Sequence, residues 1–133
     1  MKYLCLIYDE EKKLEGMSKE EGEQFMGEYF GFTDGIKSSG HYVAGEALHP
    51  IATATTIRMR AGKLQTTDGP FAETKEQLGG FYLIEARDLN EAIQVAAKIP
   101  SVRTGSIEIR PVVDFSVDAP EAALKQQPAT QRA

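Results

Sequence analysis

The sequence predicts a single α+β domain, because β-prone apolar segments alternate with two amphipathic helical patterns along a short chain. Its 133 residues are 41% hydrophobic and 26% charged, which suits one globular domain with one core. The segment from Tyr3 to Tyr8, YLCLIY, is continuously apolar and β-prone, as expected of a central strand covered on at least one face. We expect the domain to span residues 1–115 and to begin with this strand.

A long helix is predicted over residues 19–38. Ser18 and Glu21 have the spacing of a capping box, which marks a helix start. Apolar residues then recur at helical spacing and form one stripe that should lie on the sheet: Phe25, Tyr29, Phe32 and Ile36. On the opposite face, glycines recur at 27, 31 and 35, and each costs roughly 1 kcal/mol against alanine in a helix. Two interpretations stay open: an exposed face that tolerates glycine, or close packing by a loop, the C-terminal tail or a second subunit.

Further strands are expected after this helix. His41 to Leu48 and Thr53 to Arg60 have the pattern of two antiparallel strands joined by a loop that contains Pro50. A tight connection at Ala61-Gly62-Lys63 should lead to a short extra strand at Leu64 to Thr67.

The chain then turns back toward the sheet. Thr74 and Gln77 repeat the capping-box spacing and predict one helical turn. A strand is expected over Phe81 to Ala86, directly after Gly79-Gly80. These glycines should let another backbone approach closely.

A second helix and a last strand complete the domain. Asp88 and Glu91 cap a helix over residues 89–98, whose expected apolar stripe is Leu89, Ile93 and Ala96 or Ala97. Ile107 and Ile109 alternate with charged residues in the last strand. The order β-α-β-β-(short β)-β-α-β contains the split βαβ of a ferredoxin-like fold, with an extra hairpin strand.

Composition and charge exclude several classes of protein. A formal net charge of -5, with 15 Lys and Arg that form no extended run, argues against a nucleic-acid partner. The apolar run near the start is too short for a signal peptide or a membrane span, so we expect a cytoplasmic protein with no membrane contact. The single cysteine, Cys5, should be a small buried hydrophobe. Residues 116–133 lack apolar periodicity and are expected to form a disordered tail.

The most distinctive segment is Thr67 to Phe81, TDGPFAETKEQLGGF. Asp68 precedes Gly69-Pro70 in a turn, where its carboxylate can accept a backbone N–H and glycine escapes the steric limit on a residue before proline. Together with residues 52–58 and 105–112, this segment resembles the YCII-related, DGPF-type family over roughly residues 1–115. The resemblance implies a fold of the dimeric α+β barrel type and a function that is largely uncharacterised.

A homodimer is also expected from the strands themselves. One helical layer cannot bury all their apolar side chains, so two copies should pack sheet against sheet. The side chains expected to supply this surplus are Tyr3, Cys5, Ile7, Tyr8, Val43, Ile57, Leu83 and Ile84.

Acid–base chemistry is the catalysis that the residues leave open. There is no cysteine pair, no histidine pair at helical spacing and no phosphate-cradling loop, so neither a metal nor a cofactor is implied. The resemblance implies an Asp and a His that work together, in relatives that act on ring-cleavage lactones or chlorinated aromatic intermediates. Asp68 matches that Asp. The His expected in the first helix is missing here, and His41 is the nearest substitute.

The other candidates are expected to bind the substrate. Arg58 or Arg60 would hold a negative charge of the substrate, and Tyr42 and Phe71 are the further substrate-binding candidates. The strand pairing expected above places Asp68 beside Thr56, roughly 13 Å along the sheet from His41, which is too far for a hydrogen-bonded pair unless a bulge intervenes. A structural role for Asp68, capping its own turn or pairing with Arg58, therefore stays open beside the site role.

Two classes of function fit the sequence. One is a small enzyme doing isomerisation or elimination on a small cyclic or carbonyl compound. The other is a non-catalytic protein that binds a small molecule, and the resemblance implies an accessory role in sigma-factor pathways for some members. A shared pocket with ionisable groups would favour the enzyme.

Overall fold

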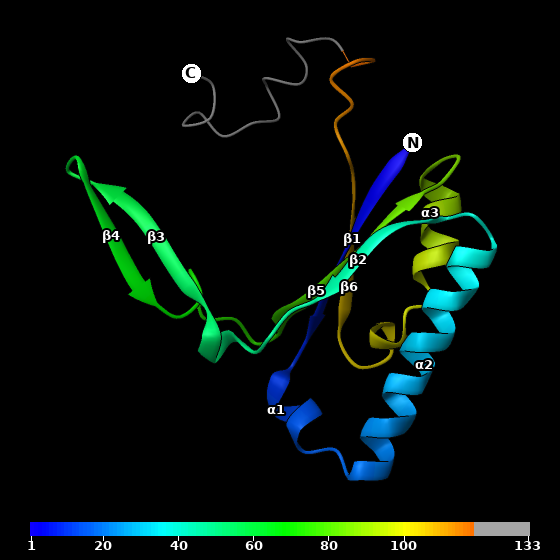
Figure 1. Ribbon diagram of the computed structural model, residues 1–133, viewed down its shortest axis with the longest axis horizontal. Coiled ribbons are helices and arrows are strands. Elements are labelled where there is room, and N and C mark those ends of the chain that lie inside the picture. The colour runs from blue at the N-terminus through cyan, green and yellow to red at the C-terminus, as the bar shows by residue number, and fades with distance from the viewer. Residues whose placement is uncertain (119–133) are drawn as a thin grey trace.

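The computed structural model describes residues 1–118, which form a ferredoxin-like α+β fold (Figure 1). Four strands make one antiparallel sheet in the order β2-β5-β1-β6, which is the split βαβ arrangement predicted from the sequence. These strands are β1 (Lys2–Asp9), β2 (Tyr42–Ala47), β5 (Gln77–Glu85) and β6 (Ser106–Pro111). The helices α2 (Lys19–Ser38) and α3 (Leu89–Ala96) cover one face of this sheet (Figure 1).

Helix α2 has the predicted bounds, because both halves of its capping box form. Ser18 Oγ accepts a hydrogen bond from the Glu21 N–H, and the Glu21 carboxylate accepts one from the Ser18 N–H. Ile36 is buried, and Tyr29 and Phe32 pack against the core, so the predicted stripe does lie on the sheet.

Helix α3 forms where predicted but buries a different face. Asp88 caps it by accepting a hydrogen bond from the Glu91 N–H at 2.9 Å. The expected stripe was wrong at Leu89 and Ile93, which are about half exposed, and right at Ala96, which is buried together with Ala92 and Val95. Small side chains let this short helix lie close to the sheet, which apolar spacing alone does not indicate.

Alternation along β1 builds the core. Tyr3, Cys5 and Ile7 point toward the helices and are buried, beside Tyr82 and Ile84 of the neighbouring β5. Burial raises the pKa of the Cys5 thiol to about 11, so it is an unreactive core side chain, as expected.

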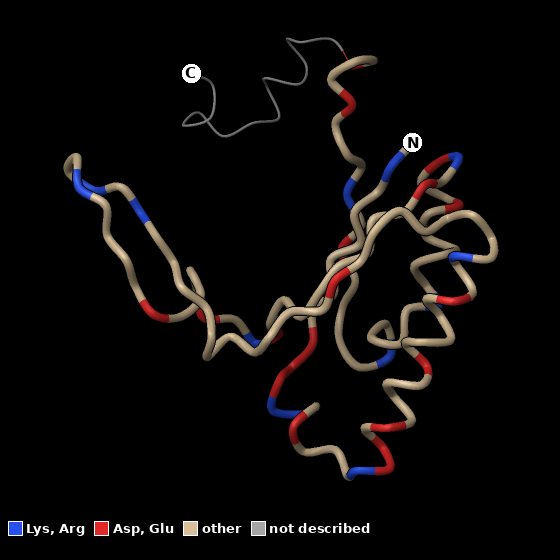
Figure 2. The backbone as a smooth tube through the Cα atoms, in the orientation of Figure 1, with Lys and Arg blue, Asp and Glu red and all other residues tan. Residues whose placement is uncertain are grey.

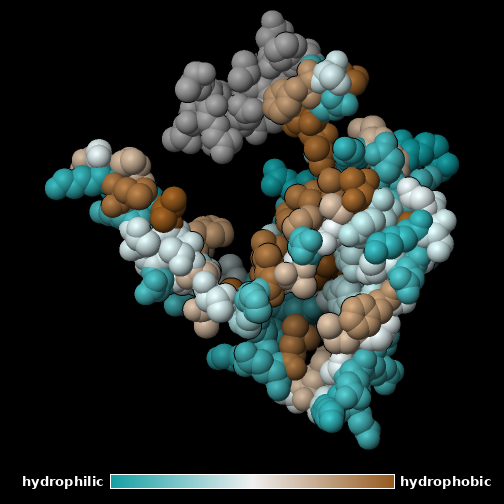
Figure 3. Space-filling view, viewed as in Figure 1, coloured by the Kyte–Doolittle hydropathy of each residue, from teal (hydrophilic) through white to brown (hydrophobic). Residues whose placement is uncertain are grey.

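The other face of the sheet is not covered by either helix. Its centre is made of four half-buried apolar side chains on paired positions of β1 and β5: Leu4, Leu6, Phe81 and Leu83. Figure 3 shows apolar side chains gathered along these strands. The expectation of surplus apolar surface holds, but Tyr3, Cys5, Ile7 and Ile84 lie on the helix side and do not contribute to it.

The strands β3 (Thr55–Arg60) and β4 (Lys63–Asp68) form a separate two-stranded sheet, here called the arm. The expected pairing of the second and third strands was wrong, since β2 pairs with β5 and not with β3. A short 3-10 helix, η1 (Ile51–Thr53), follows Pro50 and redirects the chain away from the main sheet. The arm extends on the side of the sheet opposite to the helices (Figure 1).

The segment after the arm also differs from the expectation. No helical turn forms at Thr74, whose hydroxyl donates to the Glu76 carbonyl at 2.5 Å while the Gln77 amide donates to the Thr74 carbonyl. Strand β5 already begins at Gln77, so the paired glycines lie inside it. A Cβ on Gly80 would stand 2.7 Å from the Glu46 carbonyl oxygen, which confirms the predicted close approach of two backbones.

Two short helices were not predicted, namely α1 (Glu11–Glu15) and the 3-10 helix η2 (Pro100–Val102). Each is shorter than two turns, so neither has a periodic apolar pattern to indicate it. Among residues 1–118, no helix has the length and apolar character that crossing a membrane requires. Most of the predicted tail lies outside the described residues, since these end at 118.

Candidate functional site

A cavity of about 480 Å³ lies between α1, α2 and the end of the sheet where β1 and β2 finish and β5 begins. This volume is within the range of small-molecule sites in proteins. Its walls are mainly apolar and aromatic, and include Leu14, Phe25, Tyr29, Tyr42 and Tyr82. We call it the Asp9 cavity, after the carboxylate that lines it.

Asp9 is a buried carboxylate, only 6% exposed. The alternation that buries Tyr3, Cys5 and Ile7 continues to Asp9 and turns its side chain to the helix side of the sheet. Hydrogen bonds from the hydroxyls of Ser101 and of Thr104, the latter at 2.6 Å, offset the cost of burying this charge. Helix η2 supplies Ser101, which is 1% exposed.

A chain of hydroxyl groups links Asp9 to the cavity. Ser101 gives its one hydroxyl proton to Asp9, so it must accept from Tyr29, whose hydroxyl oxygen lies 2.5 Å away. Burial raises the pKa of Tyr29 to about 12, and the nearby Asp9 charge adds to this, against the lowering effect of the Ser101 hydrogen bond. Tyr29 therefore keeps its proton at neutral pH, and its oxygen still has lone pairs for a ligand.

A second hydroxyl pair fixes another aromatic wall. Thr33 donates to the Tyr29 backbone carbonyl at 2.9 Å, so the Tyr82 hydroxyl is the donor in its 2.6 Å contact with Thr33. Burial is the main cause that raises the pKa of Tyr82, which is consequently a neutral phenol. The rings of Tyr42 and Tyr82 meet edge to face with centroids 6.5 Å apart.

The one charged side chain that the cavity holds is a carboxylate. Asp9 lines it, whereas Glu46 pairs with Phe81 and lines it through its backbone, and no Lys, Arg or His lines it among the described residues. An anionic ligand would meet a carboxylate and no counter-charge. The cavity is suited to a neutral or cationic molecule.

The predicted acid, Asp68, lies elsewhere. It is exposed at the end of β4, opposite Thr55 rather than the expected Thr56. Arg58 donates to the Phe71 carbonyl at 3.0 Å, and within residues 1–118 it forms no ion pair with Asp68. The predicted substrate contacts Arg58, Arg60 and Phe71 are likewise exposed, on the arm or just after it.

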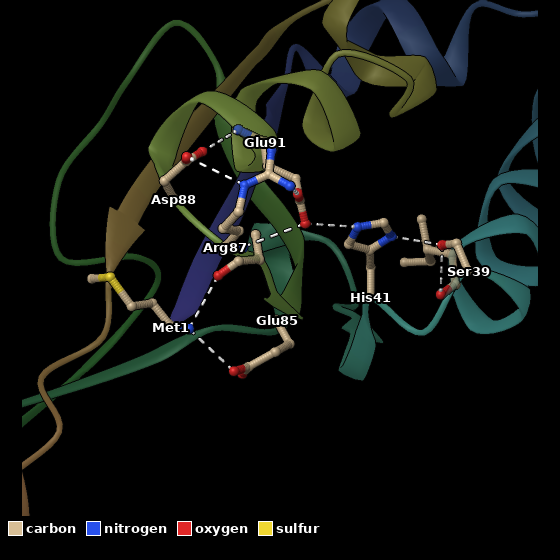
Figure 4. Close-up of polar contacts among 9 residues, drawn as sticks. Met1, Ser39, His41, Glu85, Arg87, Asp88 and Glu91 are labelled. Carbon is tan, nitrogen blue, oxygen red and sulfur yellow. Dashed lines mark hydrogen bonds and ion pairs between the residues drawn. The ribbon is translucent and has the colours of Figure 1, made fainter.

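The predicted partner, His41, has other contacts. Its Nδ1 lies 2.6 Å from Ser39 Oγ and its Nε2 lies 3.1 Å from a Glu91 carboxylate oxygen, so it connects the end of α2 to α3 (Figure 4). It lines a second cavity of about 440 Å³ between these helices. Asp68 lines neither cavity, so one chain does not bring the two residues together, and their joint role stays a prediction.

One predicted residue, Tyr42, does line the Asp9 cavity, whereas Asp9, Ser101 and Tyr29 were not predicted as site residues. The sequence does contain a signal for Asp9, because strand alternation puts this carboxylate on the same buried face of the first strand as Tyr3, Cys5 and Ile7. Ser101 has no such signal, since a 3-10 helix places it.

Comparisons with known proteins agree with this fold. The model of the YCII-related domain family matches residues 1–116. An uncharacterized protein of Rhizobium meliloti (strain 1021), R00369, is 40% identical over 114 residues, which is 84% of this chain and 92% of the relative.

A solved structure is also similar. It is 5-chloro-2-hydroxyhydroquinone dehydrochlorinase (TftG) from Burkholderia phenoliruptrix AC1100, in complex with 2,5-dihydroxybenzoquinone. The TM-score is 0.51 with 12% identity, over 90% of this chain and 100% of that one. At this identity the likeness shows a shared fold.

Proposed function

Since the chain belongs to the YCII-related domain family, we propose that it is a small enzyme that does acid–base chemistry, isomerisation or elimination, on a small neutral ring compound. The observation that carries the proposal is the buried Asp9 carboxylate, connected through Ser101 to the Tyr29 hydroxyl in an aromatic cavity. A dehydrochlorinase of the same fold, solved with a dihydroxybenzoquinone, supports the choice of ring compounds and of elimination.

The hydroxyl chain defines a path for one proton. A ligand hydroxyl would donate to the Tyr29 oxygen, Tyr29 would pass its own proton to Ser101, and Ser101 would pass one to Asp9. The ligand oxygen would then hold the negative charge. In the keto tautomer of the ring, where the carbon that carries the leaving group is tetrahedral, this oxygen would form a carbonyl, the adjacent double bond would shift to that carbon, and the leaving group would depart with its bonding electrons. Asp9 would return the proton to solvent after product release.

The charge of the cavity selects the substrate class. The buried Asp9 carboxylate, with no cation lining the cavity among the described residues, favours a neutral hydroxylated ring over a carboxylate or phosphate ester. The predicted anion-binding roles of Arg58 and Arg60 would therefore need a second copy of the chain that brings them to this cavity. The same is true of an Asp68–His41 pair.

The test is turnover of halogenated hydroquinones, with 2,5-dihydroxybenzoquinone as the binding probe. We expect Tyr29→Phe and Asp9→Asn to lower kcat by roughly a hundredfold or more, because each breaks the proton path. Tyr3→Phe is the matched control, since Tyr3 is a buried tyrosine that does not line the cavity. Equal rates in Tyr29→Phe and Tyr3→Phe would contradict the proposed path.

A second candidate function is binding without catalysis, as in a regulatory or accessory protein. The observation in its favour is that Ser101 and Thr104 already satisfy both oxygens of Asp9. Probe binding that is lost in Tyr29→Phe, with no turnover of any halogenated ring by the native chain, would favour this function.

We propose further that two copies pack through the uncovered face of the sheet, in the cytoplasm. The cluster of Leu4, Leu6, Phe81 and Leu83 at its centre is the apolar surface that such a contact would bury.

A further inference from the structure

The arm is an unusual feature of this domain, because it projects from the body and its two strands contact mainly each other (Figure 1). A two-stranded hairpin alone is at best marginally stable in water. An arm with this extended shape therefore needs a surface to lie on.

The two faces of the arm differ in character. Strand alternation and the pairing of Met59 with Leu64 put three apolar side chains on one face, with exposed fractions of 63% for Ile57, 60% for Met59 and 61% for Leu64. Arg58, Arg60 and Lys63 lie on the other face. Figure 2 shows these basic residues near the end of the arm.

We propose that the arm clasps a second copy of this chain and lays its apolar face against the body of that copy. The arm and the uncovered sheet face lie on the same side of the molecule, so a copy that packs on the sheet would stand between them (Figure 1). By two-fold symmetry its own arm would reach back to the first body, and both arms would be covered.

Charge complementarity supports a second copy as the occupant. The arm carries three cations and one carboxylate, a formal net charge of +2. The net charge of the whole chain is -5, so the rest of the chain has a net charge of -7. The uncovered face of the sheet carries three carboxylates, Glu46, Glu85 and Glu108, together with Lys2 and Arg110. Glu85 pairs with the N-terminal amine and Glu108 with Arg110. A positive arm is attracted at long range to a second body of net negative charge, which favours the encounter of two copies.

The test compares two variants that add the same charge on opposite faces of the arm. Met59→Glu lies on the apolar face, whereas Gln65→Glu lies on the basic face, opposite Arg58. Sedimentation velocity of the full chain should show a dimer whose Kd rises about tenfold or more in Met59→Glu. Losing one buried apolar contact in an interface can change Kd by that factor. In Gln65→Glu the Kd should change far less.

Hydrogen exchange gives an independent measurement. Backbone amides of residues 57–66 should exchange slowly at concentrations where the dimer forms and quickly on dilution, while amides of β1 stay protected at both. An unaltered circular dichroism spectrum will show that Met59→Glu remains folded. Three results would each overturn the proposal: a monomeric native chain, equal Kd values for both variants, or protection of the arm that does not depend on concentration. None of them depends on whether the Asp9 cavity carries out chemistry.

Discussion

At the scale of single residues, the glycines of this chain differ sharply in what surrounds them. A Cβ on Gly105 would stand 2.0 Å from the Tyr8 carbonyl oxygen and 2.7 Å from Asp9 Oδ1. Gly105 thus lets the loop before β6 pass close to the end of β1, where Asp9 lies. By contrast, a Cβ on Gly27 in α2 would meet no described atom within 4 Å.

We predict opposite effects for alanine at these two positions. Gly105→Ala should destabilise the fold by about 1–3 kcal/mol, because two backbone segments must move apart, and it should weaken probe binding by displacing Asp9. Gly27→Ala should stabilise it by roughly 0.5–1 kcal/mol, as glycine is costly inside a helix. Urea unfolding and probe titration measure both effects. A destabilising Gly27→Ala would show that something outside the described residues packs on this face, which is the alternative that the sequence left open.

At the scale of elements, the base of the arm depends on the Asp68-Gly69-Pro70 turn. Gly69 has a φ of 116°, a conformation that glycine alone adopts easily, and its N–H donates to the Ala54 carbonyl at 2.8 Å. Asp68 lies outside the core and forms no ion pair within residues 1–118. The structural role of the turn and the role of the Asp68 carboxylate can therefore be tested with different variants.

For the turn, we expect Gly69→Ala to destabilise by about 1 kcal/mol or more through backbone strain, with faster hydrogen exchange confined to the arm. For the carboxylate, we expect Asp68→Asn to leave the unfolding midpoint unchanged. If Asp68 acts in a site completed by a second copy, this variant will also lower turnover or binding. A folded Asp68→Asn with native affinity and rate would leave the motif as a structural signature only.

At the scale of the whole molecule, one layer of helices covers one face of a four-stranded sheet. The opposite face keeps its apolar centre half exposed in a single chain, with Leu6 paired to Phe81. A domain with such a face is expected to associate.

We predict that Leu6→Glu gives a folded monomer, because it places a charge in the centre of the sheet contact. Gln94→Glu, on the exposed surface of α3, adds the same charge on the helix side and should leave the dimer intact. Sedimentation equilibrium at micromolar concentration measures both. A Leu6→Glu chain that still dimerises would place the contact elsewhere, on the arm or on the helices.

Local signals were sufficient for most of the fold. The Ser18 capping box and the apolar spacing after it predicted α2 with the observed bounds, because hydrogen bonds at a helix start involve neighbours in the sequence. The split βαβ plan followed from the order of the elements, although the expected pairing of the second and third strands was wrong, and the motif segment indicated the family that residues 1–116 match. Predictions failed where tertiary packing overrode the local sequence pattern. Examples are the helical turn expected at Thr74 and the apolar stripe expected on α3.

The candidate site was decided by tertiary structure. Asp9 meets Ser101 across 92 positions of sequence and Tyr29 meets Ser101 across 72, so no local pattern places the three together. Strand alternation determined that Asp9 faces inward. Only the packing of α2 and η2 against the end of β1 gave that buried charge its hydroxyl partners and an aromatic cavity, because a carboxylate can stay in the interior only where hydrogen bonds replace its water.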